Sequence, residues 1–303
     1  MRYFGQNIKL IVNDLVVSYT DQGPDESPVI IFIHGFPLNK SMWDNQVELL
    51  KDNFRVITYD IRGHGESDAG NDAFTIDLFV LDLINLMNSL KIDKASLCGL
   101  SMGGYIALNA IKNYPERIKS LVLCDTNCFA DSAEAKEKRM KTVENIIKDG
   151  VNKYADLSIK NLFSIGSFSK MTAEIASVKE MIVNTSELAL CSTLIALSSR
   201  LETCSKLVDI NVPVLILVGK EDILSPPDAA NIMHEKIKNS SLQVIENAGH
   251  LSNIENPDVF NQHLNAFFNS VYKEQLTIRN PGVNSIFKDL RDKLNVLFSF
   301  KSI

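Results

Sequence analysis

The chain has 303 residues, of which 45% are hydrophobic and 22% are charged, and its formal net charge is −6 at pH 7. A chain of this length and composition can bury the core of one large domain. The acidic balance argues against a nucleic-acid partner, because nucleic-acid-binding surfaces normally gather lysine and arginine.

The first residues lack the apolar segment of a secretory signal, and no stretch approaches the apolar length of a membrane span. We therefore expect a cytoplasmic protein. The five cysteines are odd in number and no two of them have Cys-x-x-Cys spacing. This pattern predicts buried free thiols.

The first third of the chain predicts alternating strands and helices. Short apolar runs indicate strands, and apolar residues spaced three and four apart indicate helices. In chain order we expect a hairpin over 8–12 and 15–19, a buried strand over 29–33, a helix over 42–50, a strand over 54–59, and a helix over 76–90 that Thr75 caps. The core-facing side of this last helix is predicted from the spacing of Leu78, Leu81, Ile84 and Met87.

Residues 95–105 read Ala-Ser-Leu-Cys-Gly-Leu-Ser-Met-Gly-Gly-Tyr and predict a strand, a sharp turn and a helix from Met102 to about Asn113. Ser101 lies in the turn, between Gly99 and Gly103. Glycines at this spacing let two backbone segments pass close together while the serine adopts a strained conformation. The helix that follows directs its free N–H groups toward any negative charge that develops beside the serine. We therefore predict a nucleophilic serine with an adjoining oxyanion site.

The alternation of strands and helices stops after a strand over 119–124. From 126 to 203 the chain has no proline, only two glycines and repeated helical spacing, which predicts an all-helical insertion. Its expected helices run from about 132 to 150, 151 to 163, 172 to 184, and 186 to 200. The sheet then resumes with a strand over 213–219, a helix over 228–237, a strand over 242–245 and a helix over 257–268. This alternation favours a doubly wound, mostly parallel sheet.

Two polar residues follow strands late in the chain and fit the chemistry that Ser101 requires. A serine hydroxyl needs a base at neutral pH, and His250 can supply one. The imidazole in turn needs a carboxylate to fix its tautomer, and we assign this role to Asp222. Asp125, which ends the strand over 119–124, is the second candidate for this carboxylate.

The nucleophile pattern, the His34-Gly35-Phe36-Pro37 loop and the chain order Ser101, Asp222, His250 together resemble the α/β-hydrolase fold serine hydrolase superfamily over residues 5–270. The resemblance implies an α/β-hydrolase core over 1–125 and 206–270, with a helical cap over 126–205. It also implies an oxyanion hole made by the backbone N–H groups of Phe36 and Met102.

Among these hydrolases, Gly-Leu-Ser-Met-Gly and Trp43 resemble small carboxylesterases and 3-oxoadipate enol-lactonases. The expected function is therefore hydrolysis of carboxylic esters with small to medium acyl groups, without cofactor or metal, and with substrate contacts from Phe36 and Trp43. Dehalogenases and epoxide hydrolases of this fold carry aspartate where Ser101 stands, which disfavours both. An enol-lactonase, a C–C bond hydrolase and a slow-turnover small-molecule receptor remain as alternatives.

Residues 271–303 lie beyond this resemblance and carry six basic and three acidic residues. After Pro281 and Gly282, apolar residues recur at spacings of three and four and predict one amphipathic helix: Ile286, Phe287, Leu290, Leu294, Leu297 and Phe298. We expect this face to contact protein, as in a homodimer, and not an anionic membrane surface.

Overall fold

The computed structural model describes residues 5–279. Their eight strands form one sheet in the order β1-β2-β4-β3-β5-β6-β7-β8. The hairpin of β1 (Gly5–Val12) and β2 (Leu15–Gln22) is antiparallel, and β2 pairs antiparallel with β4. From β4 to β8 in this order, all neighbouring strands are parallel. These strands are β3 (Val29–Ile33), β4 (Arg55–Tyr59), β5 (Ala95–Leu100), β6 (Ile118–Cys124), β7 (Val214–Gly219) and β8 (Ser240–Ile245).

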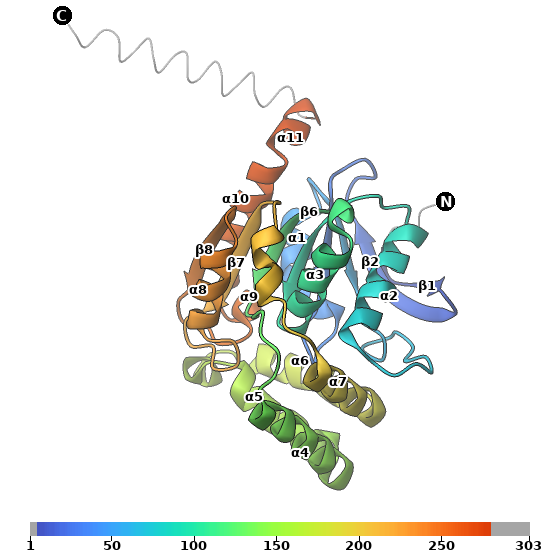
Figure 1. Cartoon of the computed structure of the whole chain (residues 1–303), viewed down its shortest axis with the longest axis vertical. Coiled ribbons are helices and arrows are strands. Elements are labelled where there is room, and N and C mark those ends of the chain that lie inside the picture. The colour runs from blue at the N-terminus through green and yellow to red at the C-terminus, as the bar shows by residue number, and fades with distance from the viewer. Residues whose placement is uncertain (1–4, 280–303) are drawn as a thin grey trace, which may run out of the picture. The chain divides into compact units, whose positions relative to one another are not determined.

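Helices flank this sheet and follow its strands in turn, as Figure 1 shows. These helices are α1 (Asp44–Leu50), α2 (Ile76–Ser89), α3 (Met102–Asn113), α8 (Pro227–Lys236), α9 (Ser252–Glu255) and α10 (Pro257–Val271), and α11 (Lys273–Arg279) follows α10 in the chain. The central strands β4 and β5 are buried at every position, which explains their continuous apolar sequences. The predicted α/β-hydrolase architecture, a mostly parallel sheet flanked by helices, is confirmed.

Helix α2 begins as predicted, because the side chain of Thr75 accepts a hydrogen bond from the N–H of Leu78. The predicted core-facing side is wrong at Leu81, which is 44% exposed. The buried stripe instead includes Phe79 and Leu83. Apolar residues occur nearly all round this helix, so spacing alone could not identify the face that packs on the sheet.

The insertion between β6 and β7 is helical throughout the described structure. It contains α4 (Ala133–Asp149), α5 (Val151–Leu162), α6 (Thr172–Val183) and α7 (Glu187–Ser199). Helix α4 packs against α5 and α7, and α5 packs against α6. Figure 1 shows the four helices gathered beyond one end of the strands. The range 126–205 is called the cap below, although its division from the core as a separate domain stays a prediction.

Two of the five cysteines form a disulfide, which corrects the prediction of free thiols. Cys128 lies where the chain enters the cap and Cys204 lies where it leaves, 76 residues later in the sequence. The N–H of Thr203 also donates a hydrogen bond to the carbonyl of Cys128. The disulfide forms because the segment that enters the cap and the segment that leaves it lie side by side. The spacing of cysteines in the sequence cannot predict such a contact. Cys98, Cys124 and Cys191 are buried free thiols.

The described residues up to Asn265 form one compact unit, and those from Ala266 belong to a second. The second unit contains the end of α10 and all of α11. The predicted amphipathic face from Ile286 to Phe298 lies outside the described residues, so its role in a homodimer stays a prediction.

Within residues 5–279, no single helix is both long and apolar enough to cross a membrane. Helices α6 and α7 together meet both criteria, but they are bent by 93° relative to each other. The cytoplasmic location stays a prediction.

Candidate active site

The turn between β5 and α3 places Ser101 in a strained conformation, with φ 53° and ψ −112°. Two glycines permit this turn. A Cβ atom on Gly99 would lie 2.2 Å from the carbonyl oxygen of Gly103, and one on Gly103 would lie 2.1 Å from that of Ile33. Ser101 is tied to the next strand by its N–H, which donates to the carbonyl of Cys124 at 2.9 Å. The sharp strand-turn-helix unit is therefore present as the sequence predicts.

His250 and Asp222, 28 residues apart, are brought together by the loops after β8 and β7. Nδ1 of His250 lies 2.8 Å from Oδ2 of Asp222, and both side chains are nearly fully buried. The other carboxylate oxygen accepts hydrogen bonds from the N–H groups of Leu224 and Ser225. Asp222 is thus held rigidly, and the Nε2 atom of His250 stays available to the cavity that Ser101 lines.

Burial by itself would lower the pKa of His250, because the charged imidazolium loses its hydration. The negative charge and the hydrogen bond of Asp222 outweigh this effect and raise the pKa above the ordinary value of 6.5. The pair therefore favours an imidazole that readily accepts a proton.

Asp125, the second carboxylate candidate, lies close by but makes different hydrogen bonds. Its Oδ1 accepts from the N–H of Gly219, and its Oδ2 accepts from the hydroxyl of Ser252. Burial, together with the nearby charge of Asp222, raises the pKa of Asp125 to about 8. Asp125 therefore braces the ends of the two loops that carry Asp222 and His250, and Asp222 is the carboxylate bonded to the imidazole.

Ser101 and His250 line one cavity of about 490 Å³ between the core and the cap. Phe36 and Met102 line it as well. Neither backbone N–H of these two residues donates a hydrogen bond to another group in residues 5–279. Two free donors beside a serine have the chemistry of an oxyanion hole. That catalytic role stays a prediction.

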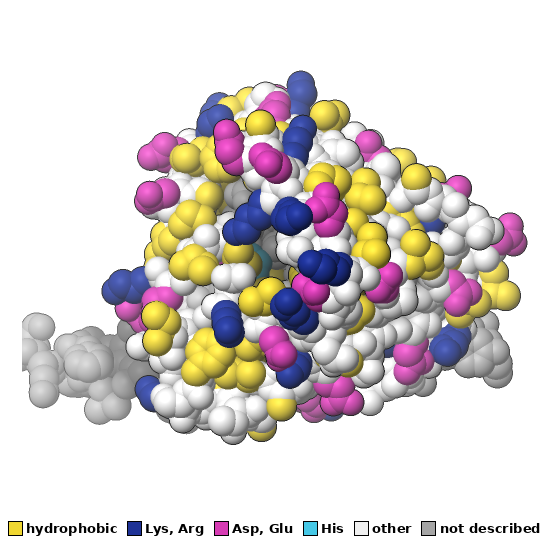
Figure 2. All heavy atoms as spheres, turned by 90° about the horizontal axis from the view of Figure 1, so that it is seen from below, with side chains coloured by type: hydrophobic (Ala, Val, Ile, Leu, Met, Phe, Trp, Pro, Cys, Tyr) yellow, Lys and Arg dark blue, Asp and Glu magenta, His cyan; other side chains and the backbone are white. Residues whose placement is uncertain are grey.

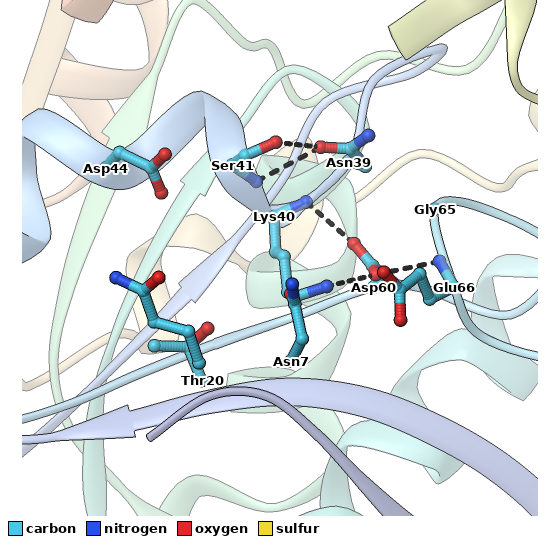
Figure 3. A pocket seen from close by; sticks show the side chains of 10 residues that line it. Asn7, Thr20, Asn39, Lys40, Ser41, Asp44, Asp60, Gly65 and Glu66 are labelled. Carbon is cyan, nitrogen blue, oxygen red and sulfur yellow. Dashed lines mark hydrogen bonds and ion pairs between the residues drawn. The ribbon is translucent and has the colours of Figure 1, made fainter.

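The loop that carries Phe36 is anchored by a buried ion pair a few residues further on. Nζ of Lys40 lies 2.6 Å from Oδ2 of Asp60, and the N–H of Lys40 donates to Oδ1 of the same carboxylate. Figure 3 shows Asp60 between Lys40 and Glu66, whose N–H also donates to it. This anchor joins the loop after β3 to the loop after β4 and limits how far Phe36 can move.

Trp43 does not line the cavity, which corrects the prediction that it contacts substrate. Its side chain is fully buried, and its ring lies 4.9 Å from that of Phe32 and 6.3 Å from that of Phe260, between ring centroids. A large aromatic ring gains more from such packing than from partial exposure. Trp43 is a core residue.

Sequence reasoning missed the charged residues of the cap that line the cavity. Asp131 precedes α4, Arg139 lies within α4, and Arg200 follows α7. A signal was present in α4, where Ala135, Lys138, Arg139 and Thr142 share one helical face and all line the cavity. The charged composition of this helix nevertheless resembles an ordinary solvated surface, since Ile146 is its one buried residue.

Residues 5–279 contain no group of three His, Cys, Asp or Glu side chains that could hold a metal ion.

Comparison with known proteins gives consistent matches over most of the chain. A family model described as alpha/beta hydrolase fold matches residues 28–257. 3-Oxoadipate enol-lactonase 2 of Acinetobacter baylyi is 29% identical over 257 residues, which are 85% of this chain and 94% of that protein. A thermophilic esterase from Thermogutta terrifontis, solved with malate bound, is 32% identical, with a TM-score of 0.83 over 88% of this chain and 99% of that one. The enol-lactonase from Burkholderia xenovorans is 28% identical, with a TM-score of 0.81 over 86% and 99% of the two chains.

Proposed function

The chain belongs to the alpha/beta hydrolase fold family, and from this premise we propose that it is a serine hydrolase that cleaves carboxylic esters of small to medium acyl groups. The observation that carries the proposal is the buried His250–Asp222 pair, which faces the same cavity as the strained Ser101. Serine, histidine and aspartate are the residue types of a nucleophile, a base and an orienting carboxylate, and the chain order Ser101, Asp222, His250 is the order of the triad in this fold.

In the proposed reaction, Oγ of Ser101 attacks the ester carbonyl carbon while Nε2 of His250 takes the hydroxyl proton. Asp222 stabilises the imidazolium through Nδ1. The N–H groups of Phe36 and Met102 donate to the oxyanion of the tetrahedral intermediate. Collapse of this intermediate breaks the ester C–O bond, and His250 returns the proton to the leaving alcohol. Water then attacks the carbonyl carbon of the acyl-enzyme while His250 takes a proton from it. His250 returns this proton to Oγ of Ser101 as the acyl C–O bond breaks, which releases the acid and restores Ser101.

A second candidate is an enol-lactone substrate, because two of the similar proteins are named enol-lactonases. Ring opening of a lactone uses the same acyl chemistry, with a leaving group that stays attached to the acyl chain. Hydrolysis rates for a panel of esters, lactones and 1,3-diketones distinguish cleavage of an ester or lactone C–O bond from cleavage of a C–C bond. Binding of such compounds with turnover near the uncatalysed rate would instead favour a receptor.

The test of the proposal is covalent labelling. We expect a fluorophosphonate to label the wild-type protein at Ser101, and we expect ester hydrolysis to fall about 10⁴-fold or more in Ser101→Ala. Near-normal turnover in that variant would rule out the mechanism.

A further inference from the structure

The cavity beside Ser101 carries an excess of positive charge on an acidic protein. Its lining includes three cationic side chains, Lys138, Arg139 and Arg200, all from the cap. Among the described residues that line it, Asp131 is the single carboxylate. Figure 2, which views the chain from the cap side, shows lysine and arginine side chains gathered around a hollow in which a histidine is visible.

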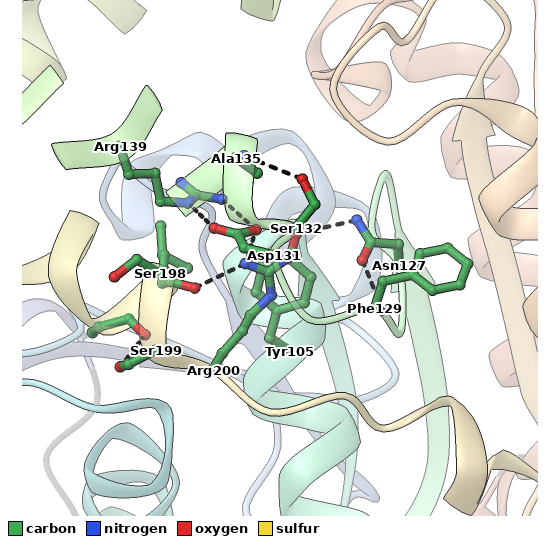
Figure 4. A network of polar contacts seen from close by, with 12 residues as sticks. Tyr105, Asn127, Phe129, Asp131, Ser132, Ala135, Arg139, Ser198, Ser199 and Arg200 are labelled. Carbon is green, nitrogen blue, oxygen red and sulfur yellow. Dashed lines mark hydrogen bonds and ion pairs between the residues drawn. The ribbon is translucent and has the colours of Figure 1, made fainter. Parts of the chain in front are cut away.

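Asp131 is shared between the two arginines. Nε of Arg139 donates to Oδ2 of Asp131, and both Nη2 of Arg139 and Nη1 of Arg200 donate to Oδ1. Both guanidinium groups point toward Asp131 in Figure 4. Burial by itself would raise the pKa of Asp131, but the hydrogen bond and charge of Arg139, with those of Arg200, lower it below the ordinary value. Asp131 is therefore ionised at neutral pH, and the three groups together keep one net positive charge.

Arg200 is held in place by contacts on several sides. Its guanidinium carbon lies 4.4 Å from the centre of the Tyr105 ring, and its Nη1 also donates to the carbonyl of Leu197. Its Nε is buried and has no hydrogen-bond partner in the described structure. These contacts fix the guanidinium of Arg200 beside the cavity, where its charge adds to that of Arg139.

Arg139 is the member of the network that can reach a ligand. Its side chain keeps 25% of its surface exposed, whereas that of Arg200 keeps 6%. Lys138, its neighbour in α4, lines the same cavity. One arginine would suffice to neutralise Asp131 and join the two ends of the cap. The second arginine and the lysine add charge that this structural role does not need.

We infer that the cap selects substrates that carry a carboxylate, or a comparable anion, on the part of the molecule remote from the ester carbonyl, and that Arg139 with Lys138 binds this anion. The inference rests on the proposed function, because it assumes that the scissile carbonyl lies at Ser101. Asp131 occupies one edge of the Arg139 guanidinium, through Nε and Nη2, and the remaining N–H groups can donate to a ligand carboxylate, so Arg139 is the principal contact.

The test uses two ethyl esters of nearly the same shape. Monoethyl glutarate carries a carboxylate where ethyl 5-methylhexanoate carries an isopropyl group. We expect wild-type kcat/KM to favour the anionic ester about tenfold or more, because charge-assisted hydrogen bonds are the strong ones. This preference should shrink at high salt.

Substitutions in α4 then assign the preference to Arg139. In Arg139→Gln, kcat/KM for monoethyl glutarate should fall about tenfold, mainly through KM, with less than a twofold change for the neutral ester. Arg139→Lys should retain part of the preference. The matched control is Lys141→Gln, since Lys141 is on the same helix but is 68% exposed and paired with Glu144. It should leave both esters unaffected.

Two results would overturn the inference. One is a wild-type preference for the neutral ester, and the other is an equal loss for both esters in Arg139→Gln, which would mean that Arg139 acts only on cap structure. If neither ester is hydrolysed, the proposed function fails, and calorimetric titration with monoethyl glutarate decides the anion site separately. Binding that weakens about tenfold in Arg139→Gln supports the site, and binding that is absent or unchanged overturns it.

Discussion

The backbone N–H of His250 donates a hydrogen bond to the carbonyl oxygen of Leu162, at 3.0 Å. His250 belongs to the core, and Leu162 is the last residue of helix α5 in the cap. The preceding residue, Gly249, donates its N–H to Glu255, whose other carboxylate oxygen accepts from the N–H of Ser164 and the hydroxyl of Ser167. The position of the proposed base is therefore tied directly to the position of the cap.

The first prediction concerns Glu255. Its replacement by alanine leaves the N–H groups of Gly249 and Ser164 buried without their acceptor, which should cost about 2 kcal/mol or more of unfolding free energy. Because the loop before His250 is then free to move, kcat should fall more than KM rises. Urea unfolding and ester kinetics measure the two effects. Glu246→Ala is the control, since Glu246 is 62% exposed and pairs with Lys220. A Glu255 variant as stable and active as this control would contradict the assignment.

The second prediction separates the two carboxylates near His250. Asp222→Asn should lower kcat about 10⁴-fold, because the amide favours the wrong imidazole tautomer and cannot stabilise the imidazolium. Asp125→Asn should stay within about tenfold of the wild-type kcat, since Asp125 bonds Gly219 and Ser252 and not the imidazole. Ester hydrolysis by the two purified variants decides the matter. The reverse order of effects would transfer the orienting role to Asp125.

The third prediction concerns the pH dependence of activity. The proposed mechanism needs a neutral His250, so kcat/KM should fall as the pH drops below the pKa of this imidazole. Asp222 raises that pKa above the ordinary 6.5 despite burial. The acidic limb should therefore lie above pH 6.5, and Asp222→Asn should move it to lower pH in whatever activity remains. Initial rates of ester hydrolysis from pH 5 to pH 9, at constant ionic strength, give kcat/KM as a function of pH and locate this acidic limb. Activity that is flat between pH 5 and pH 8 would argue against His250 as the base.

The features that the sequence predicts correctly are those formed by residues close together in the chain. Ser101 and its turn were predictable because a strand, two glycines and a helix follow one another within about ten residues, and each leaves a local pattern. The helices of the cap were predictable for the same reason. The pairing of His250 with Asp222 required the further inference that parallel strands end at one edge of the sheet.

The remaining features depend on contacts that no local pattern contains. Asp131, Arg139 and Arg200 belong to three separate segments, and only the folded cap brings them together. Trp43 has a residue type that suits either a pocket or a core, and burial between Phe32 and Phe260 decides for the core. These are cases in which tertiary packing selects among options that the sequence leaves open.

The fourth prediction concerns acid stability. His34 and His64 are fully buried, and burial lowers the pKa of His34 to about 4 and that of His64 to about 3. At these two positions the unfolded chain binds more protons than the folded chain as the pH falls below 6.5, so the contribution of the two histidines to stability falls with pH. At pH 5 each histidine should have removed about 2 kcal/mol of unfolding free energy relative to pH 7.5. Asp125 and His250, whose pKa values are raised in the folded chain, change stability in the opposite direction over the same pH range. The contribution of the histidines is therefore measured by urea unfolding of the wild type and of His64→Gln at both pH values, and the variant should lose about 2 kcal/mol less between pH 7.5 and pH 5. The same loss in both proteins would contradict a neutral, buried His64.

The fifth prediction concerns the disulfide that joins the two ends of the cap. Cys128 and Cys204 close a long loop, and such a cross-link stabilises a folded protein mainly by restricting the unfolded chain, here by about 4 kcal/mol. The double variant Cys128→Ser, Cys204→Ser should therefore unfold at a lower temperature and respond no further to reductant, whereas the wild-type protein should lose stability when reductant is added. Alkylation under denaturing, non-reducing conditions, read by mass spectrometry, should modify three cysteines in the wild type and all five after reduction. Five modified cysteines before reduction would show that the pair is not joined, and the two crossings between core and cap would then depend on the hydrogen bond of Thr203 and the ion pairs of Asp131.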